Sequence, residues 1–392
     1  MPWEESLPMD QKTQFVSEYL RGTVAFAELC RRYQISRKTG YKWAARYDEC
    51  GPSGLGDRTR RPLSSPTQTP DAIRAAIVAA RRRHPTWGAK KLLKVLRTAD
   101  PDAAWPSRRT ANDILAREGL QRRRVRPRRC GHPGKPTTVA SAPNHLWCVD
   151  FKGQFKTLDG RYCYPLTVTD AFSRYLLCCH GLLSTESKPT QALFDQLFRR
   201  HGLPERIKSD NGTPFASTAL GRLSPLSVGW IRLGIVPELT QPAKPYQNGQ
   251  HERMHRVLKA ETTRPPAATL AAQQRRFDRF RREYNLVRPH EALDLETPAT
   301  LFTASPRRLP TVIEPLRYPP HFETRLVSTN GGIRWNSKWV AVSTTCAGHH
   351  IGLEAVDHEI WDVYFGPIKL GRLLEDTLRI EDDRGRSTRR HV

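Results

Sequence analysis

The sequence lacks several features that would assign it to common classes of protein. It contains no run of about eighteen apolar residues, the length that a membrane-spanning helix needs. Its first residues, MPWEESLPMDQK, are polar and acidic, so we expect no secretory signal. The eight cysteines form no Cys-x-x-Cys pair, and the one tight group, Cys178-Cys179-His180, lies in an apolar run typical of a strand. The sequence therefore predicts a reduced, cytoplasmic protein without structural zinc.

Acidic residues are scarce beside basic ones. The 392-residue chain has 39 Asp and Glu against 64 Lys and Arg, which gives a net charge of +25 and a pI near 10.2. Such an excess repels itself unless a polyanion neutralises it, and nucleic acid is the commonest reason to keep it. A protein bound to a membrane surface would need an amphipathic helix with a bulky apolar face, and we find no strong one. We therefore expect a nucleic-acid-binding protein of about two to four domains.

Residues 1–62 are typical of a helix-turn-helix domain. Residues 10–48 contain three short helical patterns, and Ser36 is a suitable N-cap for the third. A short helix, a tight turn and a basic helix form the motif whose second helix enters the major groove of DNA. The alternative is a small three-helix module with a solvated basic face. The residues of the third helix that we expect to contact DNA are Arg37, Lys38, Lys42 and Arg46.

Residues 63–120 repeat the helical pattern. DAIRAAIVAARRRHP, WGAKKLLKVLR and SRRTANDILAREG predict three more helices, the last capped by Ser107, and so a second helix-turn-helix domain. Residues 121–143 then contain QRRRVRPRRCGHPGKP, from which no core can be built. We interpret this segment as a basic linker whose clustered arginines bind phosphates. The linker residues that we expect to contact DNA are Arg122, Arg123 and Arg124.

The composition changes at residue 144. Three β-rich runs follow in close succession, NHLWCVDFKG, RYCYPLTVTDAF and RYLLCCHGLL, with Asp159-Gly160 as a hairpin signal. Helices and strands then alternate as far as a helix at 270–286, which predicts an α/β domain at 144–305 with a mixed sheet covered by helices. Residues 306–392 show weaker helical patterns and a hairpin signal at 330–332, which predicts a small C-terminal β-barrel or sandwich.

Three acidic residues stand where catalytic groups often lie. Asp150 ends the predicted strand LWCVD, Asp210 ends ERIKSD, and Glu252 lies in the first turn of a helix. Each one alone has an ordinary explanation as a turn, a cap or a charge that favours the helix dipole. In a mixed α/β sheet, however, strand ends and helix starts gather along one edge, so the three can meet. Converging carboxylates would bind a divalent metal, and two such ions can promote in-line displacement at phosphorus.

Five motifs occur in an order that resembles one family. WCVDFKG, TVTDAFSRY, SDNGTPF, PYQNGQHERMHRVLK and YNLVRPHEALDLETPA are similar to the integrase-type catalytic core of bacterial insertion-sequence transposases of the DDE type, which are related to retroviral integrases. The resemblance covers nearly the whole chain and includes the WGAKKL motif upstream. It implies an RNase H-like fold and a catalytic, metal-binding triad of Asp150, Asp210 and Glu252, with two Mg²⁺ or Mn²⁺ ions. The residues around Glu252 that we expect to contact DNA are Tyr246, Gln247, His255, Arg256 and Lys259.

The resemblance implies a transposase that acts on double-stranded DNA near the nucleoid. It would bind the terminal inverted repeats of its element, cut a strand, and direct the 3′-hydroxyl at target DNA. Two ends must be handled together, so we expect at least a dimer on DNA and no membrane partner. The alternatives are an RNase H-like nuclease without strand transfer and a catalytically silent DNA-binding regulator.

Asp210 and Glu252 have 41 residues between them, and we expect the extra length to form a surface loop at 220–230. Asp170 also ends a predicted strand, and we expect a structural role for it. The run Arg288-Pro289-His290 is expected to stabilise the last helix of the core rather than to catalyse.

Overall fold

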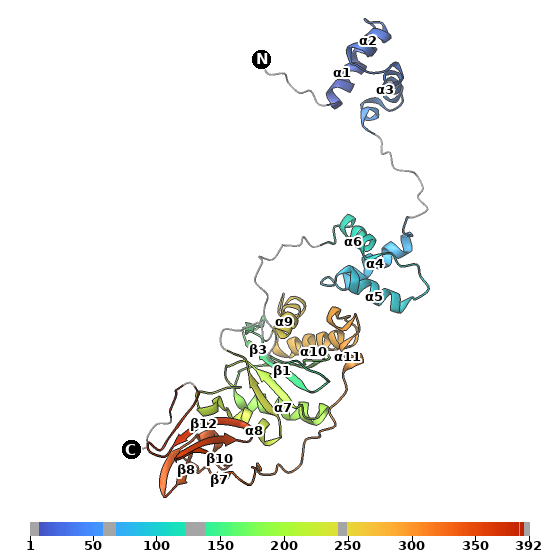
Figure 1. The fold of residues 1–392 in the computed structure, drawn as a ribbon. Helices are drawn as coiled ribbons and strands as arrows, with labels where there is room; N and C mark the ends of the chain where they lie inside the picture. The colour runs from blue at the N-terminus through green and yellow to red at the C-terminus, as the bar shows by residue number, and fades with distance from the viewer. Residues whose placement is uncertain (1–7, 58–67, 122–137, 242–248, 384, 388–392) are drawn as a thin grey trace, which may run out of the picture. The chain divides into compact units, whose positions relative to one another are not determined.

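The computed structural model describes residues 8–57, 68–121, 138–241, 249–383 and 385–387, and the chain forms two compact units, Met1–Thr69 and Pro70–Val392 (Figure 1). The division lies a few residues after the predicted boundary at 62, and the predicted domain limits within the larger unit stay predictions. None of the helices in the described ranges has the length and apolar character that crossing a membrane requires.

The first unit is a three-helix module. Its elements are α1 (Pro8–Arg21), α2 (Phe26–Arg32), α3 (Arg37–Cys50) and the 3₁₀-helix η1 (Gly51–Leu55). Phe15, Leu29 and Trp43 form its small core, one side chain from each α-helix. The Ser36 side chain accepts a hydrogen bond from the backbone N–H of Thr39 at 3.2 Å, which satisfies one of the free donors at the start of α3. The predicted cap and the short helix before a basic helix are therefore confirmed.

The larger unit begins with a second three-helix module. It consists of α4 (Asp71–Arg83), α5 (Ala89–Ala99) and α6 (Arg108–Arg117), and Ser107 caps α6 as predicted. Ile77, Leu92 and Ile114 bring the three helices together around the fully buried ring of Trp87.

A mixed sheet forms the centre of the larger unit. Its strands are β1 (Leu146–Phe151), β2 (Phe155–Lys156), β3 (Tyr162–Asp170), β4 (Leu176–Leu182), β5 (Arg206–Ser209) and β6 (Val236–Leu239). The order is β2-β3-β1-β5-β6, with β4 paired to β3. The first strands pair antiparallel as the hairpin signal predicts, whereas β5 and β6 run parallel to β1 because helices connect them.

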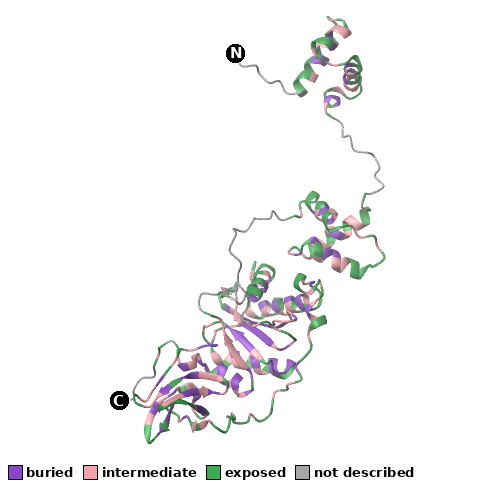
Figure 2. Ribbon diagram, viewed as in Figure 1, coloured by how far each residue is buried: buried purple, intermediate pink, exposed green. Residues whose placement is uncertain are grey.

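Helices cover both faces of this sheet (Figure 1). The helices are α7 (Ser187–His201), α8 (Pro225–Arg232), α9 (Gly249–Thr262) and α10 (Leu270–Leu286), followed by η4 (Glu291–Leu293) and α11 (Pro298–Leu301). Trp147 and Val149 of β1 pack with α7 and α8, whereas Cys163 of β3 and Cys179 of β4 pack with α9 and α10. Residues of the central strands are accordingly among the most buried in the chain (Figure 2). The buried thiols Cys178 and Cys179 have the structural role that the sequence indicated.

The prediction of a surface loop at 220–230 is wrong. This segment forms η2 (Leu220–Arg222) and most of α8, and its apolar side chains are buried. Leu220, Val228 and Ile231 pack in the same core as the C-terminal strands. A Cβ atom at Gly221, where φ is +60°, would lie 2.7 Å from Leu370 Cδ2, so the backbone here approaches the C-terminal sheet too closely for a larger residue.

The predicted closed β-barrel at the C-terminus is not confirmed. An open antiparallel sheet is found in the order β13-β12-β11-β10-β7, beside the separate hairpin β8-β9. The strands are β7 (Glu323–Leu326), β8 (Gly332–Trp335), β9 (Lys338–Ala341), β10 (His350–Asp357), β11 (Ile360–Phe365), β12 (Ile368–Leu374) and β13 (Arg379–Glu381), with η5 at Thr344–Cys346. A hairpin is present, but it lies a few residues after the predicted turn at 330–332, because the chain reverses at 336–337, between β8 and β9. Sheet and hairpin bury one common core, which α8 completes.

Candidate active site

The pairing of β1 with β5 brings two of the three predicted carboxylates together. These parallel strands pair Leu146 with Arg206 and Cys148 with Lys208, an offset of sixty residues. Continuing this register by two residues puts Asp210 opposite Asp150, on neighbouring strands that are about 4.8 Å apart. Residues paired in this way point to the same face of a sheet, and Trp147 and Val149 point to the α7 and α8 face. Asp150 and Asp210 therefore point to the face that α9 and α10 cover.

A tight turn holds Asp210 at the end of β5. The backbone N–H of Gly212 donates to Asp210 Oδ1 at 3.1 Å, and Asn211 Nδ2 donates to the carbonyl of Thr240 at 2.7 Å. Arg222 Nη1 donates to Asn211 Oδ1 at 2.6 Å. The turn is thus attached both to the end of β6 and to η2, while the Asp210 carboxylate remains exposed.

The charge of Glu252 also acts on Asp150. Burial is the largest of the effects that raise the pKa of Asp150 to about 7, and the carboxylates of Asp210 and Glu252 raise it further, against a lowering effect of Lys152. Glu252 itself is exposed in the first turn of α9. Three negative charges therefore influence one another at this edge of the sheet.

The fit to a metal ion can be judged from the donors. Carboxylate oxygens are the ligands that Mg²⁺ prefers. A bound cation would oppose both effects that raise the pKa of Asp150, which are first burial and then repulsion from Asp210. Within the described ranges, however, no three His, Cys, Asp or Glu side chains are arranged to hold one ion. The chain has appropriate donors for a divalent cation in Asp150 and Asp210.

Two buried histidines join α9 to β3 beside Asp150. The hydroxyl of Thr167 donates to the carbonyl oxygen of Asp150 at 3.0 Å and lies 2.7 Å from Nε2 of both His251 and His255. A hydroxyl has one proton and a carbonyl can only accept, so both imidazoles must donate from Nε2. Nδ1 of His251 then accepts from the hydroxyl of Thr169 at 3.0 Å. This network fixes the position of α9, and so of Glu252, on the sheet.

The prediction that His255 contacts DNA is corrected by this arrangement. Its side chain is 6% exposed and points to the sheet. The 3.6 Å distance from its Nδ1 to Asp150 Oδ2 would suit an ion pair, but burial, followed by the charges of His251 and Lys152, lowers the pKa of His255 to about 2. Burial likewise lowers the pKa of His251 to about 3. Both rings are therefore neutral at neutral pH. The role of His255 is to hold α9 against β3 beside Asp150.

The sequence contained a signal for this pair. His251 and His255 are four residues apart and lie on one face of α9, with Glu252 between them, which is also the spacing of a helical zinc motif. Their ring nitrogens are directed at threonine hydroxyls and at Asp150. The spacing therefore marks the buried face of α9.

Asp170 has the structural role that we predicted. It is fully buried, and its oxygens accept hydrogen bonds from the backbone N–H groups of Asn144 and Ser173, both at 2.7 Å, and from the Ser173 hydroxyl at 2.6 Å. Burial raises its pKa, and these three hydrogen bonds oppose that effect. Its oxygens are used to hold the loop between β3 and β4.

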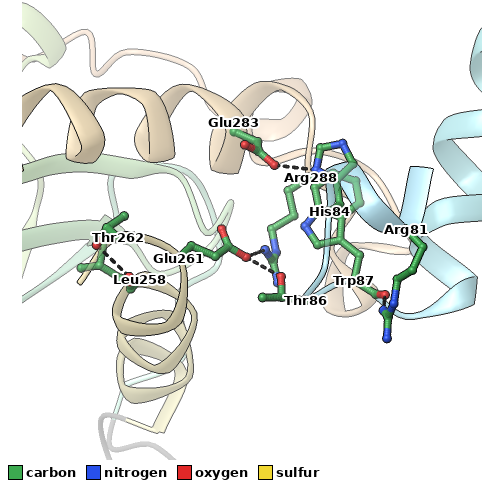
Figure 3. Close-up of polar contacts among 9 residues, drawn as sticks. All are labelled: Arg81, His84, Thr86, Trp87, Leu258, Glu261, Thr262, Glu283 and Arg288. Atoms are coloured by element: carbon green, nitrogen blue, oxygen red, sulfur yellow. Dashed lines mark hydrogen bonds and ion pairs between the residues drawn. The ribbon is translucent and has the colours of Figure 1, made fainter. Parts of the chain in front are cut away.

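The far end of α9 is anchored to the second helical module (Figure 3). Glu261 accepts from Arg288 Nη1 at 2.9 Å, and the Arg288 guanidinium lies 5.7 Å from the ring centroid of Trp87. His84 Nδ1 lies 2.8 Å from Glu283 Oε1 of α10. Arg288 is buried, which agrees with the stabilising role predicted for its motif. These contacts fix the end of the helix that carries Glu252.

The remaining predicted DNA contacts divide into three sets. Arg37, Lys38 and Lys42 are exposed on α3, and the charged groups of Lys42 and Arg46 lie 4.4 and 5.1 Å from the ring of Trp43. Arg256 and Lys259 are exposed on α9. The residues that lie outside the described ranges are Arg122, Arg123, Arg124, Tyr246 and Gln247.

Four family matches cover much of the chain. Integrase core domain families match residues 140–245 and 233–298. A Helix-turn-helix domain family matches residues 11–62, and a Homeodomain-like domain family matches residues 39–115. The integrase matches contain the five motifs quoted above, apart from the last residue of the fifth. They span the strands and helices that surround Asp150.

Similar proteins come from insertion elements and from retroviruses. The chain is 28% identical over 288 residues to the 39.2 kDa protein of insertion element IS476 from Xanthomonas euvesicatoria, which covers 72% of this chain and 79% of that protein. It is 33% identical over 120 residues to the Gag-Pol polyprotein of avian reticuloendotheliosis virus, covering 30% of this chain and 10% of the polyprotein. A solved structure of the HTLV-2 integrase catalytic core domain, in complex with magnesium, is also similar. The match spans 42% of this chain and 100% of that chain, with 18% identity and a TM-score of 0.34. From the family matches and the insertion-element relative, the chain is an integrase-family transposase with helix-turn-helix DNA-binding domains.

Proposed function

We propose that the protein cuts DNA at the ends of its own mobile element and joins the resulting 3′-hydroxyl to target DNA. The residues that carry out this reaction are Asp150, Asp210 and Glu252. The observation that carries the proposal is the register of β1 and β5, which puts Asp210 opposite Asp150 when it is continued by two residues. Glu252 lies in the first turn of α9, the helix that covers the face to which both would point. The pKa of Asp150, raised by both other carboxylates, supports their electrostatic contact.

Asp150 and Asp210 would hold a divalent cation, Mg²⁺ or Mn²⁺, and Glu252 would complete the donor set for a pair of ions once DNA is bound. The ions would polarise the phosphodiester and lower the pKa of the attacking hydroxyl or water. The chain itself supplies the positioning. The Thr167, His251 and His255 network holds α9 on β3, and the Asn211 and Arg222 contacts hold the Asp210 turn. No covalent protein–DNA intermediate is required, because a hydroxyl or water attacks the phosphorus directly.

The helix-turn-helix modules would bind the terminal inverted repeats. Arg37, Lys38 and Lys42 are exposed along α3, the helix that occupies the major groove in such domains. Arg256 and Lys259 would contact phosphates beside the catalytic carboxylates, and the linker arginines would add further phosphate contacts. A transposase joins two ends to one target, so the active assembly would contain at least two copies of the chain on double-stranded DNA.

A strand-transfer assay tests this function. The substrates are a duplex that carries a terminal repeat of the element with a free 3′-hydroxyl, and a supercoiled plasmid, with Mg²⁺ or with EDTA. We expect a joined product with Mg²⁺ only, and its loss in Asp150→Asn, Asp210→Asn and Glu252→Gln. The matched control is Glu205→Gln, which removes an exposed carboxylate from the opposite end of β5 and should leave joining unchanged.

The same assay distinguishes the alternative functions. Cleavage of an uncut end without any joined product would indicate a nuclease that lacks strand transfer. A DNA-binding regulator would bind the terminal repeat but neither cut nor join it. In that case the Asp150→Asn variant would also behave like the wild-type chain in transposition. Either result would refute the proposed function.

A further inference from the structure

An arginine stripe runs along the outer face of α10. Arg275, Arg279 and Arg282 are all exposed and are spaced at i, i+4 and i+7, so they lie on one side of the helix. We call these three residues the α10 arginine stripe. The spacing spans about 10 Å along the helix axis at 1.5 Å per residue.

The stripe lies directly opposite the face by which α10 packs on the core. Gln273, Phe277, Phe280 and Tyr284 are buried at the complementary i, i+4, i+7 and i+11 positions. The outer face therefore has no part in holding the helix on the sheet. Like charges at i, i+4 destabilise an isolated helix, so the stripe is not explained by the stability of α10.

Carboxylates do not neutralise the stripe. In the described parts of the chain, none of its three guanidinium groups lies within ion-pair distance of an Asp or Glu side chain, and none makes a hydrogen bond to a protein group. Neighbouring arginines differ in this respect, because Arg276 Nη1 donates to the carbonyl of Pro265 at 2.7 Å and Arg281 Nη1 donates to that of Leu177 at 3.1 Å. The stripe thus presents the full donor capacity of three guanidinium groups to solvent.

The stripe is on the catalytic side of the sheet. Helices α9 and α10 pack together on the face to which Asp150 and Asp210 point, whereas α7 packs on the opposite face. Arg256 and Lys259 are exposed on α9 in the same layer. A duplex that passes over α9 toward Glu252 can therefore continue over α10.

We propose that the α10 arginine stripe binds the phosphates of the target duplex. Each strand of DNA has one phosphate per about 3.4 Å of axis, so three guanidinium groups over about 10 Å can contact three phosphates of a backbone. Contacts of this kind position a duplex and carry no base sequence. We assign recognition of the element ends to the helix-turn-helix modules, so a site that contacts only the backbone suits the other duplex, the target. The identification of the duplex as the target rests on the proposed function; the phosphate site does not.

The salt dependence of DNA binding measures the contacts. The variant is the full chain with Arg275→Gln, Arg279→Gln and Arg282→Gln, and the probe is a mixed-sequence duplex titrated in EDTA between 50 and 200 mM salt. Each phosphate contact adds about 0.9 to the slope of log K against log salt, so the slope should fall by about 2.7. Over this fourfold range of salt, the affinity of the wild-type chain should drop roughly 40-fold more than that of the variant. The control variant, Lys188→Gln, Arg199→Gln and Arg200→Gln, removes three exposed charges from α7 and should keep the wild-type slope.

Two further measurements show whether the α10 arginine stripe binds the target duplex or the element ends. With a terminal-repeat duplex as probe, the stripe variant should keep the wild-type slope, and in strand transfer it should need a higher plasmid concentration for half-maximal joining. An unchanged slope on the mixed-sequence duplex, or an equal fall in the α7 control, would overturn the phosphate site. A fall on the terminal repeat alone would overturn the target assignment. A variant that sediments as a monomer where the wild-type chain is a dimer would show a subunit contact instead. Because binding is measured in EDTA, it does not depend on catalysis. A wild-type chain that fails to join DNA would therefore refute the proposed function and leave the phosphate site unaffected.

Discussion

Replacing Asp150 by Asn should make the metal-free protein more stable, although it removes a group that we place at the centre of the reaction. The pKa of Asp150 rises from an ordinary value of 3.8 to about 7, mainly through burial and then through the charge of Asp210. A pKa raised by folding stabilises the protein fully below the unfolded value, and that stability is lost as the pH rises through the folded value. Ionised Asp150 therefore destabilises the native chain above pH 7, and Asn removes this cost.

The size of the effect follows from the same values. A pKa difference of this size corresponds to at most about 4 kcal/mol at 1.36 kcal/mol per pKa unit. The Asp150 side chain is 22% exposed, so solvent screening reduces the expected gain to about 1–3 kcal/mol at pH 8. The gain should shrink steadily as the pH falls toward the ordinary value of 3.8, and it should vanish below that pH, where Asp150 is protonated in both the folded and the unfolded chain. For the larger unit, Pro70–Val392, this gain corresponds to a rise of roughly 1–5 °C in melting temperature.

Calorimetry of the full-length chain in EDTA at several pH values measures this gain. Asp170→Asn is the matched control, because Asp170 is also buried but accepts three hydrogen bonds, which involve both of its oxygens. The amide nitrogen of Asn cannot accept the hydrogen bonds of the oxygen that it replaces. That variant should melt lower by the equivalent of about 1–3 kcal/mol. Added Mg²⁺ should raise the melting temperature of the wild-type chain and have less effect on Asp150→Asn. A melting temperature of Asp150→Asn that is lower than wild type, or higher by the same amount at pH 5 and pH 8, would refute the reasoning.

Other substitutions test the supports of the site and the N-terminal module. Thr167→Val leaves both imidazole Nε2–H groups and the Asp150 carbonyl without their partner, so it should cost about 2–4 kcal/mol in denaturant unfolding, and Thr167→Ser should restore most of this. Glu261→Gln leaves Arg288 buried without its countercharge and should cost up to about 3 kcal/mol; equal stability of the two chains would contradict the anchor. Ser36→Ala should destabilise α3 by about 0.5–2 kcal/mol, measured from the melting of the first unit, and Ser36→Asp should not.

Much of the fold follows from local patterns in the sequence. Ser36 and Ser107 cap the helices that they were expected to cap, and the Asp159-Gly160 turn joins β2 to β3, because caps and tight turns depend on a few neighbouring residues. Helices α9 and α10 of the core also lie where their patterns predicted helices, whereas α8 does not. A closed C-terminal barrel is not confirmed, because the number and length of strands do not determine whether the edge strands of a sheet meet.

The candidate site required non-local information. Asp150 and Asp210 are brought together by an offset of sixty residues between β1 and β5, which no local pattern specifies. His255 was placed with the DNA contacts because it lies three residues after Glu252, yet residues at i+3 and i+4 diverge by 100° around a helix. His255 turns toward β3, and Arg256 turns toward solvent. The apolar spacing at 220–231 was present in the sequence and would have indicated a buried helix there.

The C-terminal sheet cannot be removed without damage to the rest of the larger unit. Its strands cover Leu220, Leu223, Val228 and Ile231, so a chain that ended at residue 305 would expose these side chains to water and would be prone to aggregate. Between two of these residues, Arg222 bonds to the amide next to Asp210. A displacement of the sheet by a neighbouring subunit or by bound DNA would thus reach one of the three carboxylates through this hydrogen bond.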